Sequence, residues 1–84
     1  MRYYYLTFRS VTHAQRGERV LSGEGIRCQL LRTPRWMEEQ GCGYCLRLWT
    51  EDAFGAAEAL RRSRVPLRKV YVQRHDGQLE ELAL

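Results

Sequence analysis

The sequence predicts an α+β domain with the element order βαββαβ, in which a four-stranded antiparallel sheet carries two helices on one face. Two stretches with helix caps and terminators lie between four short segments with strand-like alternation. The 84 residues suffice for one domain with a single core, and 44% hydrophobic and 29% charged residues are typical of a folded chain. We expect this ferredoxin-like, split βαβ domain to span residues 1–74 and a C-terminal tail to span residues 75–84.

Four segments show the two-residue period that is typical of β-strands. They are residues 2–8, 26–31, 44–49 and 68–74. In the third segment two leucines alternate with Arg47 and Trp49, and the leucines should face the core because burying an unpaired arginine is costly. The open face of the sheet should then display Tyr3, Tyr5, Arg27, Arg47 and Trp49.

Capping residues define the two expected helices. Ser10 or Thr12 can cap the first helix, which should run through about Ser22 before two glycines end it. Thr50 can cap the second helix, whose buried side should consist of Ala53, Phe54, Ala57 and Leu60, with arginines in the last turn. Small residues in the first helix favour close packing on the sheet.

Three cysteines occur in a chain without a secretion signal, so we expect reduced thiols. Cys28 should be a core residue of the second strand. Cys42 and Cys45 have the spacing of a redox pair, but three extended residues span about 10 Å and a disulfide tolerates about 7 Å between Cα atoms. Zinc would need two more ligands, and only Cys28, His13 and His75 remain. A tight turn would still allow the disulfide, so both interpretations stay open as minor ones.

A third interpretation makes Cys42 a single reactive thiol. It lies at the end of a long loop, and loops of this length in small domains are often functional. Gly43 offers an unshielded backbone N–H, and Arg35 and Arg47 are close enough in sequence to supply positive charge. Thiolates form in such electropositive, partly exposed surroundings.

A fourth interpretation is nucleic-acid binding. RNA-recognition-motif domains share this strand order and carry aromatic residues on their first and third strands. The phase of the third strand differs, because that register would place Cys42 where a base-stacking aromatic belongs and would bury Arg47. The predicted open face could nevertheless stack bases or pair two subunits.

Charge and hydropathy limit the partners and the cellular location that we expect for the protein. The net charge is +4, and all basic residues except Lys69 are arginines, which makes anionic partners plausible but is also ordinary for a solvated surface. No stretch approaches the roughly 18 apolar residues of a membrane span, and the N-terminus lacks the pattern of a signal peptide. We therefore expect a cytoplasmic protein without membrane contact.

Three stretches of the chain resemble a family of small bacterial domains catalogued as selenium/sulfur carrier-like proteins. They are "YYYLTFRS", "GIRCQLLRTPR" and "CGYCLRL", and the resemblance covers roughly residues 2–73. It implies a ferredoxin-like fold and a cysteine, here Cys42, that holds sulfur or selenium as a persulfide or selenopersulfide. The thiolate would attack an activated donor, and an acceptor thiolate would then remove the terminal atom.

Two features depart from the family pattern. The segment "WMEEQG" is bulkier and more acidic than usual, so Glu38 and Glu39 would raise the pKa of Cys42 if they folded over it. Cys45 stands where a small residue is usual, which indicates a conservative replacement rather than a second reactive thiol.

We therefore expect a carrier or accessory protein rather than a turnover enzyme, without a cofactor or bound metal. Cys42 would be the carrier thiol, Gly43 the N–H donor, and Arg35 and Arg47 the cations that stabilise the thiolate. The expected partners are sulfur or selenium donor and acceptor proteins, with a homodimer through the open face. The alternative is a module that binds nucleic acid or protein through that face, with nucleic acid less favoured than the donor and acceptor proteins.

Overall fold

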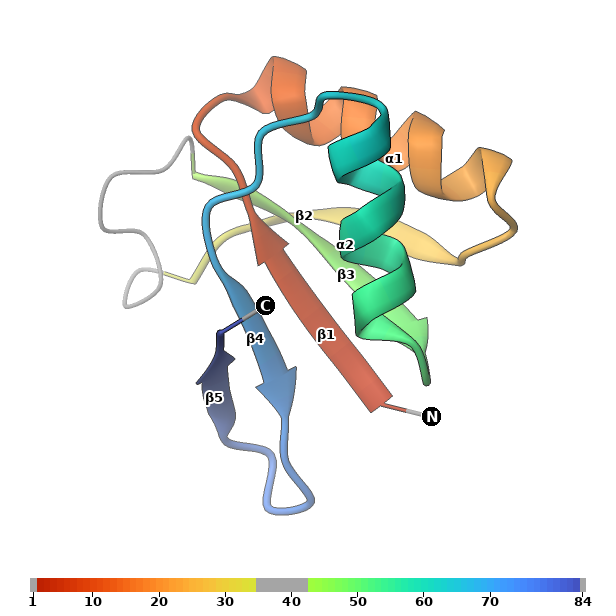
Figure 1. Cartoon of the computed structure of the whole chain (residues 1–84). Helices are drawn as coiled ribbons and strands as arrows, with labels where there is room; N and C mark the ends of the chain where they lie inside the picture. The colour runs from red at the N-terminus through yellow and green to blue at the C-terminus, as the bar shows by residue number, and fades with distance from the viewer. Residues whose placement is uncertain (1, 35–42, 84) are drawn as a thin grey trace.

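The computed structural model describes residues 2–34 and 43–83, which form a five-stranded antiparallel sheet and two helices (Figure 1). In chain order the elements are β1 (Arg2–Thr7), α1 (Val11–Gly23), β2 (Cys28–Arg32), β3 (Tyr44–Thr50), α2 (Ala53–Arg62), β4 (Val70–Gln73) and β5 (Leu79–Leu82). The strands lie side by side in the order β2-β3-β1-β4-β5. The α+β class and the βαββαβ order of the first six elements are confirmed.

The prediction of four strands is wrong, because a fifth strand continues the sheet beyond β4. The chain reverses in a three-residue loop in which Gly77 adopts the positive φ of 86°. The Gly77 N–H donates to the Arg74 carbonyl (2.9 Å), and the Arg74 N–H donates to the Gln78 carbonyl (2.7 Å). A turn followed by a left-handed glycine is a common hairpin connection, and it places Leu82 against the core. Part of the expected C-terminal tail is thus an edge strand.

Side-chain caps begin both helices. The Ser10 hydroxyl accepts the His13 N–H (3.1 Å) at the start of α1, as the sequence predicts. In α2 the cap is Asp52 instead of Thr50, because the Asp52 carboxylate accepts the Gly55 N–H (2.7 Å). Thr50 lies two residues earlier, and its hydroxyl accepts the N–H of Asp52 (3.0 Å). Both residues therefore act in the same turn, and the expected capping residue was wrong by two positions. The prediction that Phe54 lies on the buried side of α2 is also wrong, because this side chain is 64% exposed.

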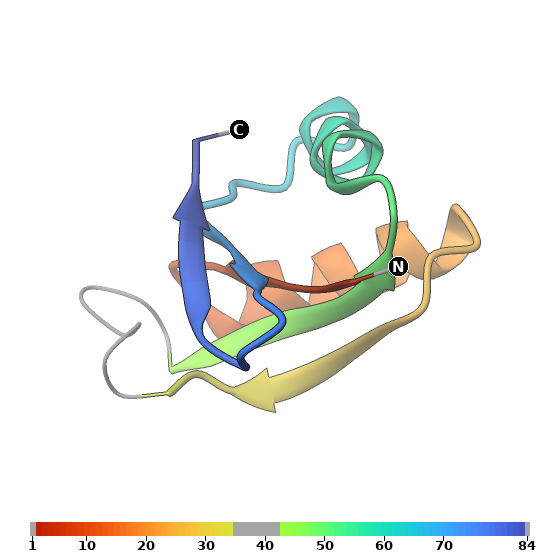
Figure 2. The same ribbon diagram turned by 90° about the horizontal axis from the view of Figure 1, so that it is seen from below.

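The hydrophobic core lies between the sheet and the helices, which sit on the same side of the sheet in Figure 2. Its fully buried large side chains are Leu6, Phe8, Leu21, Leu46, Leu48 and Leu60. A Cβ at Gly17 of α1 would meet Phe8 and Leu46 at 3.2 Å, so the absence of a side chain there lets α1 approach β3 closely. The predicted phase of β3 is confirmed, since its leucines are in the core and Trp49 is 39% exposed.

The two helices end in the same backbone motif with different residues at its left-handed position. After α1, Ile26 N–H donates to Leu21 (2.9 Å) and Gly25 has a φ of 77°. After α2, Val65 N–H donates to Leu60 (2.9 Å), and the left-handed residue is Arg64 with a φ of 56°. This position favours glycine, because a residue with a Cβ costs free energy in the left-handed region.

We expect Arg64→Gly to raise the free energy of unfolding by roughly 0.5–1 kcal/mol. Relief of the left-handed strain outweighs the extra conformational entropy that glycine gives the unfolded chain. Urea denaturation followed by circular dichroism measures the change. Arg64→Ala is the matched control, because it removes the same charge and keeps the Cβ; equal stabilisation by both variants would contradict the strain explanation.

Candidate functional site

Gly43 lies directly after the predicted carrier cysteine, at the entrance to β3. It is buried and adopts a φ of 81°, which favours a residue without a side chain. Its carbonyl accepts the Thr33 N–H (2.9 Å), so the chain leaving β2 and the chain entering β3 are joined at this point. Cys42 and Arg35 lie outside the described residues, as do Glu38 and Glu39.

Basic residues gather at one end of the strands, on the rim of the sheet where β3 begins. The Arg32 guanidinium lies 5.3 Å from the centre of the Tyr44 ring, its partner in the β2–β3 register. Arg68 and Lys69 precede β4 at the same edge, where the Thr7 N–H donates to the Lys69 carbonyl (2.9 Å) and the Arg68 N–H donates to the Thr7 carbonyl (2.9 Å). We call Arg32, Arg68 and Lys69 the edge cations. Alternation within single strands does not predict this group, because it forms only when the antiparallel sheet brings the end of one strand beside the start of the next.

Arg47 lies further along β3 and is engaged elsewhere. It is four residue steps from Gly43 along the strand, which corresponds to roughly 13 Å. Its guanidinium donates to the Gln29 side-chain oxygen (2.7 Å) and lies 4.7 Å from the centre of the Tyr3 ring. Its predicted contact with the Cys42 thiolate remains a prediction.

The other two cysteines, Cys28 and Cys45, are partly buried and buried, respectively. Cys45 has 0% exposed surface within β3. Cys28 packs against the core, and its Sγ lies 3.8 Å from the Glu18 carbonyl oxygen. Burial raises the pKa of the Cys28 thiol, the Glu18 charge raises that pKa further, and a hydrogen bond with Ser22 lowers it in part. Burial thus shields Cys45 from solvent, and the raised pKa of Cys28 disfavours its thiolate.

The predicted open face gathers four of its five residues around one hollow. The hollow has a volume of about 350 Å³ and is lined by Tyr3, Arg27, Cys28, Gln29, Arg47 and Trp49. The Tyr3 and Trp49 ring centres are 4.6 Å apart, with the rings tilted by 51°. Tyr5 lies beside this group, opposite Arg47 in the β1–β3 register.

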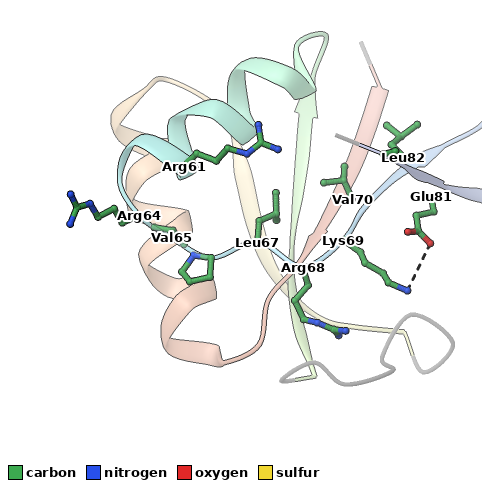
Figure 3. Close-up of a pocket in the computed structure, with 11 residues that line it drawn as sticks. Arg61, Arg64, Val65, Leu67, Arg68, Lys69, Val70, Glu81 and Leu82 are labelled. Carbon is green, nitrogen blue, oxygen red and sulfur yellow. Dashed lines mark ion pairs between the residues drawn. The ribbon is translucent and has the colours of Figure 1, made fainter.

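A larger groove of about 560 Å³ lies between the end of α2, the connection to β4, and β5 (Figure 3). Val65, Leu67 and Leu82 give it an apolar lining. Lys69 is paired with Glu81 across 3.9 Å. Figure 3 shows the Arg61 and Arg64 side chains pointing in opposite directions, so the cations do not converge on one point and we assign no site to this groove.

Among residues 2–34 and 43–83, no group of three His, Cys, Asp or Glu side chains is placed to hold a metal ion. No helix in the same ranges has the length and apolar character needed to cross a bilayer.

The comparisons with known proteins identify one family. Its model, described as "Putative Se/S carrier protein-like", matches residues 3–72, which span β1 through most of β4. Neither a curated protein nor a solved structure matches the chain. Because the match covers well over half of the sequence and includes the entrance to β3, the chain belongs to the Se/S carrier protein-like family.

Proposed function

We propose that the protein carries sulfur or selenium as a persulfide or selenopersulfide on Cys42, and that it acts as a carrier rather than as a turnover enzyme. The observation that carries this proposal is the state of the other two thiols. Cys45 is fully buried, and the pKa of Cys28 is raised by burial and by Glu18. A carrier thiol must ionise and reach a partner protein, so Cys42 is the best candidate of the three.

The surroundings of Gly43 support the same proposal. The edge cations give this end of the sheet positive charge, which favours a thiolate on the neighbouring cysteine. Lys69 is partly neutralised by Glu81, so Arg32 and Arg68 are the stronger contributors. Gly43 can donate its N–H without a side chain in the way. Arg35 and Arg47 remain proposed as further cations for the same thiolate.

The transfer chemistry needs no external oxidant. The Cys42 thiolate attacks the terminal sulfur of a donor persulfide, so a new S–S bond forms as the donor's S–S bond breaks, and the donor leaves as a thiolate. An acceptor thiolate then attacks the terminal sulfur on Cys42, takes it, and returns Cys42 to the thiolate. With selenium as the terminal atom, the same exchange gives a selenopersulfide. The partners are therefore donor and acceptor proteins that themselves present reactive thiols.

The proposal is tested by incubating the protein with a persulfide donor and locating the added sulfur by mass spectrometry. Wild type should gain one sulfur on Cys42, and Cys42→Ser should gain none. Cys28→Ser and Cys45→Ala are matched controls and should load like wild type. A Cys42→Ser protein that folds and still forms the adduct would sink the proposal.

The pH dependence of alkylation gives a second readout. The Cys42 rate should rise with a midpoint below the pKa of about 8.5 of free cysteine, because positive charge stabilises the thiolate. The Cys28 midpoint should lie above that value because its pKa is raised. The reverse order would show that Cys42 is not the ionised thiol.

A further inference from the structure

Two aromatic side chains form an exposed pair on the face of the sheet that the helices leave uncovered. Tyr3 and Trp49 are cross-strand partners on β1 and β3, near the middle of the sheet. They remain 37% and 39% exposed, although their flanking residues Tyr4 and Leu48 contribute to the core. Large aromatic side chains exposed in the middle of a sheet are typical of a binding surface.

The aromatic pair forms a ridge between two hollows. Tyr3 and Trp49 line both hollows, whose volumes are about 350 and 370 Å³. On the β2 side the first hollow adds Arg27 and Arg47, and on the β4 side the second adds Arg2 and Arg74. Each hollow is therefore lined by two arginines.

The charged residues that line these two hollows are all basic. Among the described residues that line the two hollows are four arginines and His75, and none is a carboxylate. Arg74 does pair with Asp76 (3.8 Å) and Glu80 (3.7 Å) outside the hollows, but all three side chains are more than half exposed, so these pairs are weak and exchangeable. Arg47 is already held by Gln29 and the Tyr3 ring, so little conformational entropy is lost when it contacts an anion.

We propose that this face binds single-stranded nucleic acid, with bases stacked on Trp49 and Tyr3 and phosphates contacted by the arginines of the two hollows. Only unpaired bases expose the faces that an aromatic ridge can stack against. A second copy of the chain fits less well, because pairing two such faces would bring eight arginines together without carboxylates lining the hollows. The partner that matches both the rings and the charge is a flexible polyanion with flat rings.

Binding is tested with the full chain and a short, fluorescently labelled single-stranded RNA of mixed sequence, followed by anisotropy. Trp49→Ala should weaken binding by about tenfold or more, because one stacked base is lost. Phe54→Ala is the matched control: it removes an aromatic side chain that is 64% exposed on α2, and it should bind like wild type.

Salt dependence tests the phosphate contacts separately. Arg27→Gln should reduce the magnitude of the slope of log affinity against log salt by about 0.7, since one counterion-releasing contact is lost. Arg62→Gln, which removes an exposed arginine of α2, should leave the slope unchanged. Because Arg27 is exposed, this variant also keeps the test valid if Trp49→Ala does not fold.

Three outcomes would overturn the proposal: no binding of the RNA, equal affinities of Trp49→Ala and Phe54→Ala, or a dimer in sedimentation that Trp49→Ala dissociates. The last result would assign the face to self-association. Cys42→Ser should bind the RNA like wild type, so the outcome here is independent of the proposed carrier function.

Discussion

Cys45 should react with iodoacetamide about a thousandfold or more slowly in the folded protein than in the urea-unfolded protein. Its side chain has no exposed surface, and β3 is paired on both sides at this residue, with Thr7 of β1 and with Leu31 of β2. The reagent reaches Cys45 only when these central strands separate, which approaches global unfolding. A stability of about 5 kcal/mol corresponds to an open fraction of roughly 10⁻³–10⁻⁴.

The measurement uses a variant with Cys28→Ser and Cys42→Ser, so that Cys45 is the remaining thiol. Its alkylation rate is compared with and without urea at one pH. A second variant, with Cys42→Ser and Cys45→Ala, leaves Cys28, which is partly buried on the edge strand β2 and should be protected less. Similar native and unfolded rates for Cys45 would remove the argument from burial that favours Cys42 as the carrier thiol.

The cost of burying Arg47 explains why the alternation of side chains predicted the phase of β3 correctly. The strand "YCLRLW" can turn either set of alternate residues toward the core, and only one of the two phases keeps Arg47 out of it. The cost of an unpaired buried charge decides between them without knowledge of the neighbouring strands. The structure has this phase, with Leu46 and Leu48 in the core and Arg47 beside Gln29.

Other features depend on contacts that the local sequence does not contain. The segment "LEEL" has the composition of an amphiphilic tail, and it becomes β5 because β4 offers a free edge and Gly77 permits the reversal. Thr50 and Asp52 are both good capping residues, and the choice between them depends on where β3 ends. Two residues two positions apart cannot be ranked by propensity alone.

The residues of the candidate sites likewise include some that alternation predicts and others that depend on the pairing between strands. Alternation predicted that Tyr3, Arg47 and Trp49 share a face, because each strand fixes which of its own residues point together. It did not predict that Trp49 would lie opposite Tyr3, since this requires the register between β1 and β3. The edge cations were missed for the same reason: Arg32 and Lys69 are far apart in the sequence, and the antiparallel order of β2, β3, β1 and β4 brings them to one edge.

Phe8→Ala should lower the free energy of unfolding by about 3–5 kcal/mol, a large part of the stability of a domain of this size. Phe8 has 0% exposed surface and directly follows β1. It packs between α1 and the sheet, because its ring and Leu46 occupy the space beside Gly17. Truncation leaves a cavity under α1 that neither the helix nor β3 can fill without disturbing the rest of the core.

Urea denaturation of wild type, Phe8→Ala and Phe54→Ala measures this effect, with Phe54→Ala as the matched control for the same chemical change. Phe54 is 64% exposed on α2, and alanine is the better helix former, so its midpoint should stay close to that of wild type or rise slightly. Phe8→Ala should shift the midpoint far downward at an unchanged slope. Equal midpoints for the two variants would mean that the contact of α1 with β3 does not hold the fold together. The basis for placing Gly43 and the edge cations at one end of a rigid sheet would then be lost.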